Sequence, residues 1–262
     1  MNTREKVKHL LSLFSGSSKV LVAINADPDA IASAMAVKRL LWRKVSEVAI
    51  AHFNTITRPE NLTMIHLTEP GLRDLKRVGQ GDYDIFVIVD SQPDHHEQFS
   101  RFRFNVVIDH HPVSWDRAEY LDIRPDYGAC STIMTEYLKS KKIKPSPKLA
   151  AALMLGIKTD TADFTRQAGI RDIRAFQYLY GFADKNIVTK VERALMTQAD
   201  LDFLGNAIRQ RVIVNNRAYF HAGNMNQPDE LVITADFFLT VARVNWSVVS
   251  GVYERKLVII IR

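Results

Sequence analysis

The chain alternates short apolar runs with segments whose apolar residues recur at helical spacing. Four β-rich apolar runs predict buried strands over residues 19–24, 47–53, 84–89 and 104–108. Apolar residues spaced three and four apart predict helices over residues 29–43, 58–67, 130–142 and 147–157. Strands that are apolar on both faces and alternate with helices are typical of a parallel sheet with helices on both faces. The pattern therefore predicts an α/β fold for the first two thirds of the chain.

The pattern changes in the last third. Short apolar runs with tight turns predict strands, and these are "RVIV", "RAYFHAG", "LVITADFF", "WSVVSGVYER" and "KLVIII". We interpret this region as a smaller C-terminal α+β domain. The predicted division is a first domain of residues 1–183, a linker of residues 184–190 and a second domain of residues 191–262. Because the chain stops directly after an apolar strand pattern, we expect the second domain to be incomplete.

Composition sets limits without selecting a function. Of 262 residues, 47% are hydrophobic and 24% are charged, which is ordinary for a soluble globular protein. No apolar run reaches about 18 residues and the N-terminus lacks the apolar stretch of a signal peptide, so we expect a cytoplasmic protein without a membrane span. The single cysteine, Cys130, excludes an internal disulfide and a multi-cysteine metal site. A net charge of +6 suits anionic partners such as nucleotides, nucleic acid or polyphosphate.

Acidic residues directly follow three of the predicted strands. Asp27 and Asp29 follow the first strand, Asp90 the third and Asp109 the fourth. Ligands of open α/β sheets bind outside the carboxyl ends of the strands, so we expect these carboxylates at one edge of the sheet. Each has an ordinary alternative, since Asp27 followed by Pro28 is also a good helix start. Four carboxylates together would repel each other, and a bound cation would remove that repulsion.

The tripeptide Asp-His-His occurs twice, and only the second copy ends a strand. Asp109, His110 and His111 follow the fourth strand directly, whereas residues 94–96 lie in the polar segment "SQPDHHEQFS". We interpret the second copy as a chemical site and the first as a solvated loop. Alanine at His95 and His96 should then leave activity near that of the wild type.

A further acid comes from "MLGIKTDTADF". Asp160 follows a strongly apolar helix pattern, so its carboxylate would lie near the negative end of the helix dipole. That position is unfavourable for an acid unless a positive charge is nearby. A loop aspartate beside Thr159 and Thr161 explains the sequence equally well.

Carboxylates combined with one or two imidazoles suit Mn²⁺ or Mg²⁺. Two such ions about 3.5–4 Å apart can hold the attacking and leaving oxygens of a phosphoryl transfer. We expect Asp90 to bridge the two ions, because it would lie on a central strand. We expect His110 to be a ligand, His111 to face the phosphoryl group as an acid or hydrogen-bond donor, and Asp109 to orient an imidazole.

Four segments resemble, in order and spacing, the motifs of the DHH phosphoesterase superfamily: "NADPDAIAS", "VIVDSQ", "VIDHHP" and "GIKTDT". That superfamily includes single-strand exonucleases, oligoribonucleases, phosphoadenosine-phosphate and cyclic-dinucleotide phosphatases, exopolyphosphatases and family II pyrophosphatases. The resemblance implies two domains with the active site in the cleft between them, and a Mn²⁺ pair, with Mg²⁺ as the alternative. By motif position it implies a phosphate-binding histidine, His111, and five metal ligands, which are Asp27, Asp29, Asp90, His110 and Asp160.

The chain departs from the family pattern in two places. The first motif usually begins with histidine, and here that position is Ala23, so one metal position would keep only Asp27 and Asp90. The Gly-Gly-His stretch of the nuclease-like members does not occur before the chain ends. The first departure predicts that one of the two metal positions is weakened.

The sequence thus predicts a metal-dependent phosphoesterase that hydrolyses short oligonucleotides or nucleotide phosphates. The alternatives are a weakly active or inactive relative that binds a nucleotide or nucleic acid, and a pyrophosphatase or exopolyphosphatase. Arg58 and Arg166 are candidates for contact with a substrate phosphate. The expected partner is short RNA or DNA or a nucleotide, and a homodimer is compatible with the sequence.

Overall fold

The structure is a computed structural model that describes residues 2–193, 196–225 and 227–262, which form two compact units. The first unit contains a six-stranded sheet in the order β3-β2-β1-β4-β5-β6, and every neighbouring pair of strands is parallel. Its strands are β1 (Lys19–Ile24), β2 (Glu47–His52), β3 (Leu72–Asp74), β4 (Ile85–Val89), β5 (Val106–Asp109) and β6 (Tyr120–Ile123). The predicted parallel α/β fold is confirmed. The sequence pattern does not predict β3 and β6, which have only three and four residues.

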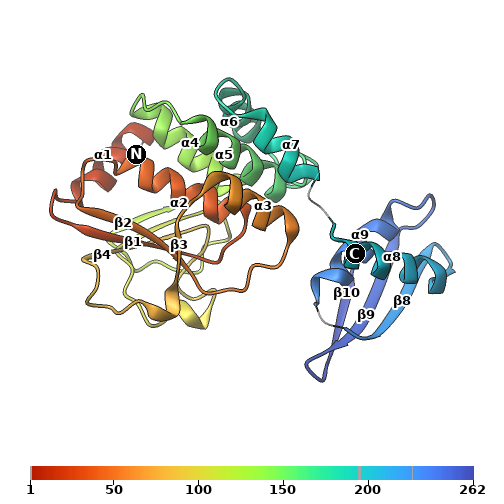
Figure 1. The fold of residues 1–262 in the computed structure, drawn as a ribbon. Helices are drawn as coiled ribbons and strands as arrows, with labels where there is room; N and C mark the ends of the chain where they lie inside the picture. Colours follow the sequence, from red (N-terminus) through yellow and green to blue (C-terminus); the bar gives the residue numbers. More distant parts are fainter. Residues whose placement is uncertain (1, 194–195, 226) are drawn as a thin grey trace. The chain divides into compact units, whose positions relative to one another are not determined.

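The two faces of this sheet are covered differently (Figure 1). In β1, Val20 and Val22 pack into a core beneath the α-helices, whereas Leu21 and Ala23 face the opposite side. The α-helices of the unit all contribute to the first core, and they are α1 (Thr3–Ser12), α2 (Pro28–Leu40), α3 (Pro59–Thr68), α4 (Cys130–Ser140), α5 (Pro147–Asp160), α6 (Ile170–Tyr180) and α7 (Lys185–Arg193).

Short 3-10 helices and aromatic side chains cover the other face. Here η1 (Leu75–Arg77) and η2 (Glu97–Phe99) supply Leu75 and Phe99 to a second core, together with Phe86 and Phe102. Both faces are therefore covered as predicted, but one of them by aromatic loops and 3-10 helices rather than by α-helices. The Phe86 and Phe102 rings stack with centroids 5.3 Å apart, so packing of large rings replaces the missing helix layer.

The second unit is a small α+β domain, as predicted. Its mixed sheet has the order β10-β9-β8-β7, with β8 and β9 parallel and the two outer pairs antiparallel. Its elements are α8 (Gln198–Gln210), β7 (Val212–Val214), β8 (Arg217–Asn224), α9 (Asp229–Leu239), β9 (Trp246–Tyr253) and β10 (Lys256–Ile261). Leu231, Phe238 and Phe220 are among the side chains of its separate apolar core.

One predicted strand is a helix. The run "LVITADFF" lies in α9, so its assignment as a strand is wrong. The buried positions of α9 are Leu231, Thr234, Ala235 and Phe238, which follow the i, i+3, i+4, i+7 spacing of a helix. The β-branched and aromatic composition favours a strand, but packing of this one stripe against the sheet decides the outcome.

The chain divides later than the predicted linker of residues 184–190. Those residues lie largely in α7, where Ile187, Val188 and Val191 are buried in the first core. The first unit extends to Arg193, and the second contains the described residues from 196 onward together with Thr57–Pro59. Among the described residues, no helix is long and apolar enough to cross a membrane.

Candidate metal centre and active site

The candidate site lies where the strand order reverses. β1 has β2 on one side and β4 on the other, and in open α/β sheets ligands bind at such a switch point, outside the carboxyl ends of the strands. Asp27 and Asp29 directly follow β1, and Asp90 directly follows β4. The end of β5 adds His110 on the far side of β4. The topology therefore gathers the predicted acids and one imidazole at a single edge.

Four of the predicted ligands form one cluster. Asp29, Asp90, His110 and Asp160 each offer an atom that could bind a metal, and these atoms lie within 4.8 Å of one another. The Nε2 atom of His110 lies 3.2 Å from Asp90 Oδ1 and 3.1 Å from Asp160 Oδ2. Asp160 is the last residue of α5, so its carboxylate lies at the negative end of the helix dipole, where a cation is favourable.

Asp29 is held rigidly at the start of another helix. The backbone N–H groups of Cys130 and Ser131 donate to its two carboxylate oxygens at 2.6 and 2.7 Å. These residues are the first turn of α4, whose positive dipole end stabilises the carboxylate. Asp29 is fully buried, so its orientation is fixed before any ligand binds.

Asp27 has a different position from the four clustered residues. It is the N-cap of α2, and its Oδ1 accepts a 2.9 Å hydrogen bond from Ala30 N–H. The side chain of Asn54 holds the preceding backbone by two hydrogen bonds, of 2.8 and 2.9 Å, to Ala26. The capping role considered from the sequence is thus present.

Asp90 adopts an uncommon backbone conformation. Its φ is 58°, in the left-handed region that costs most L-residues free energy and that Asp and Asn tolerate best. The turn is held by Asp90 N–H, which donates to the Ile108 carbonyl at 3.0 Å. Strained residues of this kind concentrate at functional sites, because the surrounding structure must maintain them.

The acids raise one another's pKa values. Burial raises the pKa of Asp29 to about 6, and the charge of Asp160 adds to the effect. Burial likewise raises the pKa of Asp27 to about 6, against the lowering effect of the Ala30 hydrogen bond. Burial, followed by the charges of Asp29 and Asp27, raises the pKa of Asp90 well above its usual range. The repulsion expected from the sequence is present, and a divalent cation would relieve it.

His110 is oriented as a metal-binding imidazole. Its Nδ1 lies 3.2 Å from the carbonyl oxygen of Tyr127, and a carbonyl can only accept, so Nδ1 carries the proton. Nε2 therefore faces the acids, the arrangement in which a carbonyl sets the tautomer of a metal-bound histidine. Burial alone would lower the pKa of His110, but Asp160 and Asp90 outweigh it and raise the pKa to about 12.

Two atoms at the centre of this cluster are buried without a hydrogen bond. Within the described part of the chain, His110 Nε2 and Asp90 Oδ1 have no hydrogen-bond partner of acceptable geometry, although they are 3.2 Å apart. Buried polar atoms are rarely left unpaired. Two such atoms, of a kind that binds divalent cations, fit a metal ion at this position.

The second Asp-His-His also forms a relay that borders the cluster, since a nitrogen of His111 lies within 4.8 Å of metal-binding atoms of Asp90 and His110. Asp109 is fully buried and accepts 2.8 Å from His111 Nδ1 and 2.7 Å from Gln92 Nε2. Burial raises the pKa of Asp109, but the bond from His111 outweighs it and the pKa is lowered. The same bond raises the pKa of His111. Asp109 thus orients the imidazole of His111, so that Nδ1 bonds to the buried carboxylate and Nε2 points away from that carboxylate.

The first Asp-His-His is not the solvated loop that the sequence suggested. Asp94 is exposed, but His95 and His96 are half-buried. The His95 ring meets that of His111 edge-on with centroids 5.5 Å apart, whereas His96 packs between Phe53 and Phe99 at 5.1 and 5.8 Å. The polar composition of the segment concealed this packing.

Other predicted positions lie outside the cluster. Arg58 groups with the second unit, where its Nε lies 3.5 Å from Asp229 Oδ1. Arg166 is exposed in the turn after Asp160, where its N–H bonds the Thr161 carbonyl at 2.8 Å. Ala23 is fully buried in the core on the second face of the sheet and offers no ligand atom.

Sequence reasoning missed several residues that build the site. Gln92 and Asn54 act through side-chain amides, and no local pattern identifies such contacts. Gly156 has a signal, because glycine inside a helix is unfavourable unless packing requires it. A Cβ there would lie 2.5 Å from Ser131 Oγ and 2.9 Å from Asp29 Oδ1. Only glycine lets α5 approach α2 this closely.

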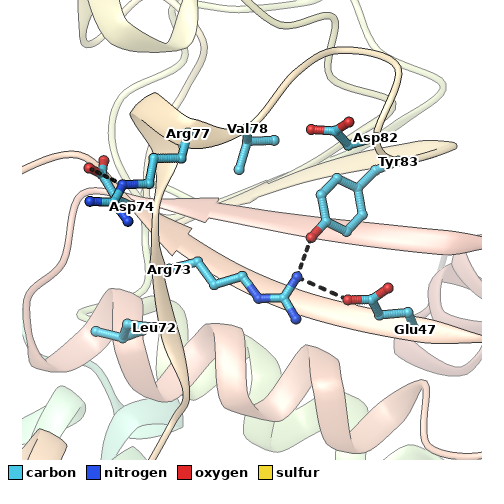
Figure 2. Close-up of a pocket in the computed structure, with 8 residues that line it drawn as sticks. All are labelled: Glu47, Leu72, Arg73, Asp74, Arg77, Val78, Asp82 and Tyr83. Carbon is cyan, nitrogen blue, oxygen red and sulfur yellow. Dashed lines mark hydrogen bonds and ion pairs between the residues drawn. The ribbon is translucent and has the colours of Figure 1, made fainter.

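A hollow of about 540 Å³ lies elsewhere, beside the edge strand β3. Figure 2 shows its two arginines, Arg73 and Arg77, each paired with an acidic side chain. Arg73 contacts Glu47 at 3.0 Å and donates to the Tyr83 hydroxyl at 2.6 Å, and Arg77 lies 3.9 Å from Asp74. With its cations already paired, this hollow is a weaker candidate than the cluster at the switch point.

Comparisons with known proteins identify the family and the fold. The sequence profile of the DHH family, N-terminal domain, matches residues 19–157, which are more than half of the chain and include three of the four clustered residues, with Asp160 just beyond the match. The chain belongs to the DHH family. An uncharacterized protein of Methanocaldococcus jannaschii is 33% identical to this DHH protein over 234 residues, which are 89% of the chain and 49% of that relative. The chain therefore spans about half the length of that relative.

Two solved structures share the fold of this DHH protein. An exopolyphosphatase-related protein from Bacteroides fragilis has a TM-score of 0.81 at 15% identity, over 99% of this chain and 83% of the other. A putative family II inorganic pyrophosphatase of Methanococcus jannaschii has a TM-score of 0.54 at 18% identity, over 92% and 87%. At these identities the likeness describes the fold alone.

Proposed function

We propose that this DHH protein is a metal-dependent phosphoesterase that hydrolyses short oligonucleotides or nucleotide phosphates. The observation that carries the proposal is the pair of unbonded buried atoms, His110 Nε2 and Asp90 Oδ1, beside the fixed imidazole of His111. A metal centre next to an oriented proton carrier has the parts that hydrolysis of a phosphate ester needs. Membership of the DHH family supports this reaction class.

The residues present divide unequally between two metal positions. Asp29, Asp90, His110 and Asp160 would hold one ion, and Asp27 with Asp90 would hold a second one more weakly, because Ala23 supplies no ligand. Mn²⁺ is the ion we propose, with Mg²⁺ as the alternative, since oxygen ligands dominate and only one imidazole joins them. When bound, such ions polarise the phosphoryl group and lower the pKa of bound water.

The relay of Asp109 and His111 would handle the proton of the leaving group. In hydrolysis, a water oxygen bonds to phosphorus and the ester bond to the leaving oxygen breaks, so the leaving oxygen must gain a proton. Asp109 keeps His111 Nδ1 occupied and raises the pKa of His111. The outward Nε2–H can then bond a phosphoryl oxygen or donate its proton.

A second candidate function follows from Ala23. Alanine has no metal-binding atom, and Ala23 is fully buried in an apolar core. This position therefore cannot supply the missing ligand. Loss of even an indirect metal contact typically lowers affinity or activity by about 10–100-fold. A protein that binds nucleotides or nucleic acid and hydrolyses them slowly is therefore the alternative, and pyrophosphate or polyphosphate are alternative substrates.

The test is a Mn²⁺-dependent hydrolysis screen of the full chain over dinucleotides, phosphoadenosine phosphate, cyclic dinucleotides and pyrophosphate. We expect release of a nucleotide or phosphate by the wild type and loss of that activity in Asp90→Asn. The matched control is Asp94→Asn, since Asp94 is the exposed acid of the other Asp-His-His. Equal activity of Asp90→Asn and wild type would overturn the proposal.

A further inference from the structure

His95 lies at the edge of the site without belonging to any recognised motif. It follows β4 and the strained Asp90 by only five residues. One of its ring nitrogens lies within 4.8 Å of both a His111 nitrogen and an Asp109 oxygen. Its ring stands nearly perpendicular to that of His111, at an interplanar angle of 85°. The two imidazoles are therefore direct neighbours.

The hydrogen bonds of His95 determine which nitrogen carries the proton. The backbone N–H of Gln92 donates to His95 Nδ1 at 3.2 Å, and a nitrogen that accepts this bond is unprotonated. The ring proton of the neutral imidazole must then be on Nε2. The two hydrogen bonds that hold the ring, from Gln92 N–H and with Ser91 Oγ, are both made at Nδ1. His95 thus presents a free N–H donor.

Gln92 positions both histidines at once. Its backbone fixes His95, and its side-chain Nε2 donates to Asp109 Oδ2 at 2.7 Å, which in turn holds His111. Gln92 is fully buried, and its Oε1 accepts from the N–H groups of Ser114 and Trp115 at 2.8 and 2.9 Å. The amide therefore joins the loops after β4 and β5 into one rigid support.

We propose that His95 is a second phosphate-binding residue, whose Nε2–H donates to a phosphoryl oxygen of the substrate beside His111. The inference rests on the proposed function and specifies the ligand group as a phosphate with at least two accessible oxygens. Two preorganised donors on one rigid support select for phosphate, because neither has to be ordered when the ligand binds.

Two variants distinguish loss of the Nε2–H donor from disruption of the loop that carries His95. His95→Asn places an oxygen near the position of Nδ1 to accept the Gln92 N–H, and it lacks the donor at Nε2. His95→Gln places an amide N–H near the position of Nε2. His96→Asn is the matched control, because His96 packs on Phe53 and Phe99 instead of facing the site. Thermal melts establish that each variant is folded.

The measurements are KM and kcat for the active substrate and the dissociation constant for inorganic phosphate, by ³¹P NMR titration with Mn²⁺ present. We expect His95→Asn to raise KM and the phosphate dissociation constant about tenfold, the typical effect of one hydrogen bond to a charged group. His95→Gln should recover most of the loss, and His96→Asn should match the wild type. If His95→Asn binds phosphate as tightly as His96→Asn, the inference is wrong.

Failure of this inference is distinguishable from failure of the proposed function. A wild type that hydrolyses none of the substrates contradicts the phosphoesterase proposal, while the phosphate titration still measures the donor at His95. Hydrolysis by the wild type with unchanged phosphate affinity in His95→Asn rejects the role of His95 alone.

Discussion

Gly156 and Asp29 are in contact across the interface of α5 and α2, so that a Cβ on Gly156 would lie 2.9 Å from Asp29 Oδ1 and 3.0 Å from its Cα. The glycine places α5, and with it Asp160 at the helix end, against the helix that carries Asp29. A backbone contact of this kind couples the stability of the first unit to the geometry of the candidate metal centre.

Gly156→Ala should therefore destabilise the protein despite the better helix propensity of alanine. Overpacking of a core costs about 1–3 kcal/mol, and the propensity gain offsets about 1 kcal/mol of it. Urea unfolding should show a net loss of up to about 2 kcal/mol, and Mn²⁺ binding should be weaker. Gly181→Ala is the control, since a Cβ there has room, at 3.6 Å from the Tyr178 carbonyl. Equal stability of the two variants would mean that the helices separate freely.

Gln92→Ala should reduce turnover through His111 rather than through the metal. Without the amide, Asp109 Oδ2 loses its 2.7 Å donor and the carboxylate can rotate, which releases His111. We expect kcat to fall about 10–100-fold, the range typical of residues that orient a catalytic group, with Mn²⁺ affinity unchanged. Gln98→Ala, at an exposed position of η2, should behave as wild type. A parallel loss of Mn²⁺ binding in Gln92→Ala would contradict the separation of relay and metal centre.

Asp27→Asn should change how stability depends on pH in the metal-free protein. Burial raises the pKa of Asp27 from 3.8 to about 6, so between these values the folded state binds more protons than the unfolded state. The contribution of Asp27 to the free energy of unfolding is then lost as the pH rises from about 4 to about 6. For one group this loss is up to about 3 kcal/mol. Asparagine caps α2 as well as aspartate does but carries no charge.

Urea unfolding in EDTA at pH 4 and pH 7 checks this sign. The wild type should lose more stability than Asp27→Asn between the two pH values, and Mn²⁺ should reduce the difference by compensating the charge. Asp94→Asn, at an exposed aspartate, should follow the wild type. An equal or larger loss of stability in Asp27→Asn between pH 4 and pH 7 would show that folding does not raise the pKa of Asp27.

The sequence predicts the scaffold well where the local pattern and the tertiary packing agree. The apolar runs of β1, β2, β4 and β5 lie in a buried parallel sheet, and the acids at their ends follow from its topology. The α9 segment fails because its residue types favour a strand while its burial follows a helix. Periodicity read over the whole run, with Leu231 and Phe238 seven apart, contains the correct signal.

The acids of the candidate site can be located from the sequence, and the residues that support them cannot. Asp29 follows a strand whose end the pattern locates, whereas Asp160 is the last residue of α5, and its approach to Asp29 depends on the packing of α5 against α2 at Gly156. The contacts of Gln92 and His95 depend on the conformation of two loops that pack together only in the folded chain. Nothing in their residue types distinguishes His95 from His96, although one faces the site and the other the aromatic core.

The most direct test of the account is Mn²⁺ binding followed by electron paramagnetic resonance, which detects the free ion, in the wild type, Asp90→Asn and Asp94→Asn. Asp90 is common to both proposed positions, so its loss removes an anionic ligand from each. We predict binding by the wild type and Asp94→Asn, with affinity reduced more than about 100-fold in Asp90→Asn. Equal binding by all three proteins, or no binding by the wild type at millimolar Mn²⁺, would contradict a metal centre at this edge of the sheet.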